Sequence, residues 1–142
     1  MRAVEQVAPV EAVEVARRLI GEMERRGCRL RTGRGRYPAV SGDYPFERGT
    51  RAVWALLGDT SGPTAPRLTI NFGSLRSVFA PEELEDLLRS LEGIPEVQHS
   101  LRAVRGADFN HYPTVPLGTL ALPGVLERFL AVWDRWIPGP PE

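Results

Sequence analysis

The sequence predicts an α+β fold in which a small, mostly antiparallel sheet of three to five strands packs against three helices, mainly on one face. Two observations carry this prediction. Strand-like segments gather in the middle of the chain, and segments with helical periodicity lie on either side of them. The candidate strands also alternate apolar and polar residues, which is typical of a sheet with one covered face. From the length of 142 residues we expect a single domain over 1–142, with flexible ends at 1–9 and 138–142.

The first helix is predicted over residues 10–26, where apolar residues recur at intervals of three and four. Gly27 follows at the position that a helix-ending glycine occupies. Residues 28–32 then alternate, with the cysteine and leucine facing inward and the arginines outward, which predicts a half-buried strand. Residues 36–40 are interpreted as a return strand at the sheet edge, because Pro38 has no N–H for a central ladder.

The middle of the sheet is predicted from the next two apolar segments. Residues 41–50 are rich in turn-forming types and predict a loop. The continuous apolar run at 51–57 predicts a central strand, and Gly49 and Gly58 beside it favour a strand over a short buried helix. Residues 67–73 alternate again, so we expect the two segments to pair as an antiparallel hairpin.

A second helix is predicted from Pro81 to the stop at Gly93 and Pro95, with acidic residues in its first turns. Its leucines form a stripe at helical spacing: Leu84, Leu87, Leu88 and Leu91. We expect this stripe to pack on the apolar face of the strands, made by Trp54, Leu56, Leu68, Ile70 and Phe72.

The last third of the chain has weaker patterns. Residues 100–104 fit either a strand or a helical turn, and residues 112–120 are predicted to be extended because Pro113 and Pro116 interrupt any regular helix. A third helix is predicted over residues 123–137.

Composition excludes several classes of protein. One Cys cannot form an internal disulfide, and with two His distant in sequence it makes no standard zinc site, so we expect no metal. The sequence has neither a glycine-rich nucleotide loop nor any other cofactor motif, so we expect no cofactor. No apolar run reaches membrane-spanning length and no signal peptide is recognisable, which predicts a cytoplasmic protein that does not enter membranes. All 18 cationic side chains are Arg, a bias typical of GC-rich, bacterial-like coding sequence.

The charge distribution has one anomaly. Six of the twelve residues in 25–36 are Arg and none is acidic, so the rest of this neutral chain is net negative. We therefore expect a non-enzymatic binding module whose Arg-rich hairpin contacts an anionic partner, nucleic acid first or else an acidic protein surface. The candidate residues are Arg25, Arg26, Arg29, Arg31, Arg34, Arg36 and Tyr37. The simpler interpretation is a solvated sheet face whose arginines stack on neighbouring side chains or pair with the acidic start of the second helix, Glu82–Asp86.

Two other functions remain open. The last helix could dock on a larger protein or a second copy of the chain through Leu126, Leu130, Trp133 and Trp136, although tryptophans at this spacing are more simply core residues. A small hydrolase could use His111 as a general base oriented by Asp108. Cys28 lies beside cations that lower a thiol pKa, but its place in the alternation favours a buried, inert thiol.

Overall fold

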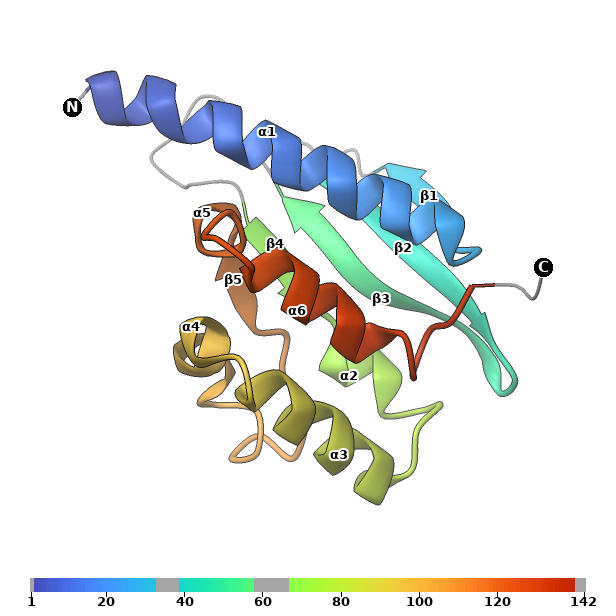
Figure 1. Ribbon diagram of the computed structural model, residues 1–142. Helices are drawn as coiled ribbons and strands as arrows, with labels where there is room; N and C mark the ends of the chain where they lie inside the picture. Colours follow the sequence, from blue (N-terminus) through green and yellow to red (C-terminus); the bar gives the residue numbers. More distant parts are fainter. Residues whose placement is uncertain (1, 33–38, 58–66, 140–142) are drawn as a thin grey trace.

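The computed structural model describes residues 2–32, 39–57 and 67–139, and it contains one five-stranded antiparallel sheet. The strands lie in chain order: β1 (Arg29–Thr32), β2 (Ala39–Phe46), β3 (Gly49–Leu57), β4 (Arg67–Ile70) and β5 (Thr114–Pro116). The long helices α1 (Arg2–Arg25) and α6 (Val125–Trp133) lie on the same side of this sheet, in front of it in Figure 1. The predicted α+β class is confirmed, and so is the antiparallel pairing of the two central strands.

Between β4 and β5 the chain forms a helical excursion that lies below the sheet in Figure 1. It consists of α2 (Phe72–Leu75), α3 (Pro81–Glu92), α4 (Pro95–Gln98) and the 3-10 turn η1 (His99–Leu101). A further short helix, α5 (Leu117–Leu120), connects β5 to α6. The three predicted helices correspond to α1, α3 and α6, and the described residues add these short ones.

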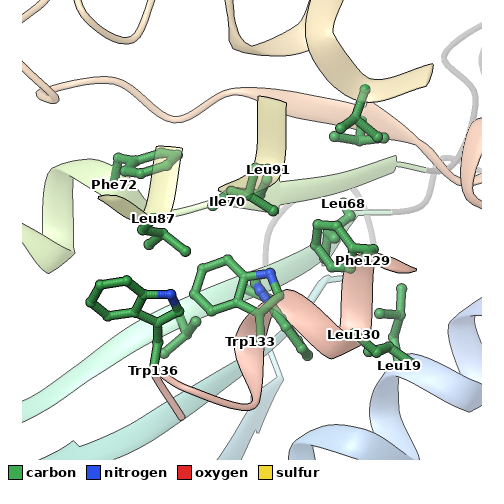
Figure 2. Close-up of a cluster of buried hydrophobic side chains, with 14 of the residues drawn as sticks. Leu19, Leu68, Ile70, Phe72, Leu87, Leu91, Phe129, Leu130, Trp133 and Trp136 are labelled. Atoms are coloured by element: carbon green, nitrogen blue, oxygen red, sulfur yellow. The ribbon is translucent and has the colours of Figure 1, made fainter. Parts of the chain in front are cut away.

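Helix α3 forms where the sequence predicts it. Pro81 occupies its first turn, and the carboxylate of Glu83 accepts a hydrogen bond of 2.7 Å from the N–H of Ala80, which satisfies one of the free donors at the helix start. All four leucines of its stripe are buried. They share one cluster with the apolar residues of the strands, and Figure 2 shows Leu87 and Leu91 in that cluster with Ile70 and Phe72.

The prediction of a loop over 41–50 is wrong, because this segment forms most of the β2–β3 hairpin. Gly42 is needed there for close packing, since a Cβ at this position would lie 2.6 Å from the sulfur of Met23 on α1. Pro45 is tolerated because β1 pairs only with Val40–Asp43, which leaves β2 without a neighbour on that side at Pro45.

The bounds of three predicted segments also differ from the structure, and a choice that the sequence left open at residues 100–104 is decided. The segment 112–120 is predicted to be extended, but only β5 is a strand and the helix α5 follows it directly. Pro116 permits this because it lies at the N-cap of α5, where the missing N–H of proline does not interrupt the helix. Residues 100–104 take the helical alternative as η1 and the turns after it. Helix α1 begins at Arg2, before the predicted start at residue 10, and α6 ends at Trp133.

The core lies between the sheet and the helices. Trp54 of β3 is fully buried and meets Trp133 of α6 edge to face, with ring centroids 5.3 Å apart. Leu19 of α1 and Phe129 of α6 belong to the same cluster (Figure 2). The helices therefore cover most of one face of the sheet, and the other face is the place to look for a site.

Candidate anion-binding face of the sheet

The strand register defines the face of the sheet that points away from α1 and α6. We call it the outer face, and its residues are Arg29, Arg31, Ser41, Asp43, Pro45, Thr50, Ala52, Ala55, Leu57, Arg67, Thr69, Thr114 and Pro116. Apart from Thr69, these side chains are exposed or half-buried, whereas the core face is buried at Trp54, Leu56 and Leu68. The outer face therefore remains accessible along most of its strand positions.

Arg29 and Arg31 project from the outer face of β1, at the edge of the sheet. Arg31 donates from Nε and Nη2 to the carboxylate of Asp43, the second bond measuring 3.2 Å, and this hydrogen bonding raises the pKa of the guanidinium. Arg29 is exposed and has no ion pair within the described part of the chain. Both arginines line a shallow hollow with Gly27, Leu30, Asp43, Pro45 and Thr50.

Arg26 is excluded from the predicted anion-binding set, because its guanidinium is buried in the fold. The residue is 2% exposed and donates to the carbonyl oxygens of Ile137 and Leu130, each at 3.1 Å. It also donates to Asp134 at 2.7 Å and to Glu22 at 3.2 Å. Arg26 thus joins the end of α1 to the end of α6; four of its five N–H donors are used there, and its side chain is only 1% exposed, so a ligand cannot reach it.

The other residues predicted to bind an anion are Arg25, Arg34, Arg36 and Tyr37. Arg25 is exposed on α1 and hydrogen-bonds to Glu22, a contact that lowers the pKa of that carboxyl. Arg34, Arg36 and Tyr37 lie outside the residues that the structure describes.

The acids of α3 pair with arginines other than those of β1. Glu85 binds Arg105 at 2.6 Å and Arg89 at 3.4 Å, and Asp86 lies 3.8 Å from Arg135. The predicted alternative, in which this acidic helix neutralises the basic hairpin, is therefore wrong for Arg29 and Arg31.

A second hollow, of about 580 Å³, lies at the opposite end of the outer face. Its lining contains both histidines of the chain: it is formed by Arg67, His99, Ser100, His111, Tyr112, Pro113, Thr114 and Pro116. We call it the histidine pocket. Sequence reasoning missed His99 as a neighbour of this site, because the two histidines approach each other only when η1 and the segment before β5 fold together.

Asp108 is not part of the histidine pocket. It is exposed, has a left-handed φ of 53°, and lies 3.7 Å from Arg76. The predicted pairing of Asp108 with His111 for hydrolysis therefore has no geometric support.

His111 and Tyr112 are held in place by α2. The N–H of Gly73 donates to the carbonyl of His111 at 3.2 Å, and a Cβ on Gly73 would lie 2.5 Å from the ring of Tyr112. The Nδ1 atom of His111 is buried and has no hydrogen-bond partner among the described residues, while other atoms of this residue line the pocket. Tyr112 is 48% exposed, which leaves much of its side chain accessible beside the pocket.

The residues predicted to form a docking face on the last helix are core residues. Leu126, Leu130, Trp133 and Trp136 are all buried. The chain turns after α6 so that the ring of Trp136 packs against Phe79, 5.4 Å away. Cys28 is also buried, and desolvation raises the pKa of its thiol to about 11, as expected for an inert thiol.

The described residues contain no cluster of three or more potential His, Cys, Asp or Glu metal ligands. Within the same ranges, no helix combines the length and apolar character needed to cross a lipid bilayer. Comparisons of this chain with protein-family models, with curated proteins and with solved structures found no match.

Proposed function

We propose that this protein is a non-enzymatic binding module that contacts an anionic partner, nucleic acid first, through the arginines on the outer face of β1. One observation carries the proposal: Arg29 and Arg31 project side by side from an accessible sheet edge, and Arg29 has no acidic partner among the described residues. Guanidinium groups in this arrangement can bind two phosphates of one backbone.

The contrast with other surface arginines supports this interpretation. Arg105 is held by both Glu85 and Glu92, and Arg128 by Glu96. Such arginines have carboxylate partners within the fold, whereas Arg29 has none among the described residues. The exposed Arg48 and Arg102 also lack an ion pair within the same ranges, so what distinguishes Arg29 is its neighbour Arg31 on the same face of β1.

The salt dependence of binding to labelled duplex DNA tests the proposal. If Arg29 and the predicted Arg34 and Arg36 each neutralise one phosphate while Arg31 stays paired with Asp43, the slope of log affinity against log salt should be about −2.7. The substitution Arg29→Ala should flatten this slope by about 0.9. Arg128→Ala removes the same charge from α6, so it serves as the matched control and should leave the slope unchanged.

A second variant tests the role of Asp43. Asp43→Asn removes the carboxylate that holds Arg31, so it should free this guanidinium and tighten binding. Asp86→Asn removes the same charge from α3, where the partner is Arg135, and should tighten binding much less. Absent binding at low salt would refute the proposal, as would equal effects of Arg29→Ala and Arg128→Ala; the arginines of β1 would then serve only to protect the sheet edge.

A further inference from the structure

We propose that the partner is a single-stranded nucleic acid that crosses the whole outer face, from the arginines of β1 to the histidine pocket beside β5. This inference rests on the proposed function and names its ligand more closely. Two features at opposite edges of the sheet support it. One is the pair Arg29 and Arg31 on β1, and the other is the histidine pocket beside β5.

The strand register connects these two ends directly. Arg31 lies opposite Ser41, which lies opposite Ala55, then Thr69 and finally Thr114 in the wall of the histidine pocket. Neighbouring strands are about 4.8 Å apart, so this row spans about 19 Å. At the stacked spacing of about 3.4 Å per nucleotide within one strand, about six nucleotides cover it.

The row between the ends suits a nucleic-acid backbone. Ser41, Ala55 and Thr69 have short side chains that are half-buried or buried, so no large side chain belongs to this row of described residues between its two ends. The hydroxyl group of the half-buried Ser41 can donate to a phosphate oxygen, whereas Thr69 is buried and contributes only a low surface. Among the outer-face strand positions the one acid is Asp43, and Arg31 already neutralises it.

The histidine pocket adds the groups that distinguish a single strand from a duplex. His99 and Ser100 in the lining offer polar contacts to a phosphate or a base edge. The half-exposed ring of Tyr112 offers a surface on which an unpaired base can stack. Bases inside a duplex already stack on each other and cannot use this ring, so the pocket favours a single strand.

The two histidines provide a direct readout, because the chain has only two and both line the pocket. We would titrate the intact protein with a six-nucleotide oligothymidine while recording the imidazole signals by NMR. Both imidazoles should shift, and the shifts should saturate at the same oligonucleotide concentration as the change in anisotropy of a labelled strand. Arg29→Ala should raise that concentration for both readouts, although Arg29 lies at the far end of the sheet.

The variant Tyr112→Leu tests the stacking contact. It should weaken binding of the single strand about 5- to 100-fold and leave duplex binding unchanged. Leu122→Ala, at another exposed apolar position, should change neither affinity. The midpoint of thermal unfolding of each variant shows that the fold is intact, and Tyr112→Phe should restore binding if that of Tyr112→Leu is reduced.

Three experimental outcomes would contradict these proposals, and each points to a different error. If no polyanion binds at low salt, the proposed function itself is wrong. If binding depends on Arg29 but the imidazole signals and Tyr112→Leu are unaffected, the function stands and the path to the histidine pocket is wrong. If duplex DNA shifts both imidazoles and binds at least as tightly as the single strand, the inference of a single-stranded ligand is overturned.

Discussion

Replacing Arg26 with Met separates its structural role from any role in binding. Met retains an apolar stem of similar length but removes every donor, so the carbonyl oxygens of Leu130 and Ile137 lose their bonds of 3.1 Å inside the fold. The carboxylates of Glu22 and Asp134 lose their partner in the same substitution.

The expected loss of stability follows from these contacts. Leaving partners of a buried charged group unpaired destabilises a protein by about 3–5 kcal/mol. Since about 1 kcal/mol shifts the unfolding midpoint by roughly 2–4 °C in a domain of about this size, Arg26→Met should lower it by about 6–20 °C. Urea unfolding followed by circular dichroism gives the free energy directly.

The adjacent residue is the control. Arg25 also contacts Glu22 and Asp134, but its side chain is 57% exposed. Arg25→Met should therefore lower the free energy of unfolding by less than about 1 kcal/mol. If Arg26→Met has an effect below about 1 kcal/mol, or one no larger than that of Arg25→Met, the assignment of Arg26 to the join between α1 and α6 is refuted.

Four further predictions concern stability and burial. Leu88→Ala should lower the free energy of unfolding by about 2–5 kcal/mol in urea melts, whereas Leu122→Ala at an exposed position should lower it by less than about 0.5 kcal/mol; equal effects would contradict the core assignment of α3. The three tryptophans are buried, so native fluorescence should be blue-shifted and poorly quenched by iodide; strong quenching would reopen docking through Trp136. The Cys28 thiol should react with a disulfide reagent at pH 8 far more slowly in the native protein than in urea, because its pKa is raised to about 11 and it is buried; rapid native reaction would refute this. The hydrogen bond from Arg25 lowers the pKa of Glu22 below its ordinary value of 4.5. This contact therefore stabilises the fold above pH 4.5, and the stabilisation is lost as the pH falls through the lower pKa of the native state. Glu22→Gln should make acid unfolding measurably less steep, and an acid-unfolding profile identical to that of the unchanged protein would contradict the assignment.

Local patterns in the sequence were sufficient to predict some of the helices and strands. The stripe of leucines in α3, with Pro81 before it and Gly93 after it, is a helix pattern that needs no tertiary partner to be recognised. The apolar run of β3 and the alternation of β4 likewise predict their strands and their pairing. In these elements the local preference and the tertiary fold agree.

Strand β2 could not be predicted in this way, because its unusual residues are explained only by their neighbours. Gly42 is explained by the sulfur of Met23 on α1, and Pro45 by the early end of β1. Both residue types indicate a loop when they are considered without these contacts.

The candidate site was predicted only in part, again because tertiary contacts decide where some of its residues lie. Composition alone identified Arg29 and Arg31, but Arg26 belongs to the core stripe of α1. It follows Leu19 and Met23 at helical spacing, and that spacing was the signal in the sequence that it faces inward. No local signal connects His99 to His111, because they meet only through the pairing of β5 with β4 and the helical excursion before it.

Paramagnetic broadening by a spin-labelled oligothymidine tests most directly whether the ligand binds the outer face of the sheet. The side chains of Ala55 and Thr114 lie on that face, whereas the exposed Ala131 belongs to α6, the helix that lies against the other face of the sheet. We predict that the label broadens the Ala55 and Thr114 signals and leaves Ala131 sharp. Broadening of Ala131 with sharp signals from Ala55 and Thr114 would contradict binding on the outer face.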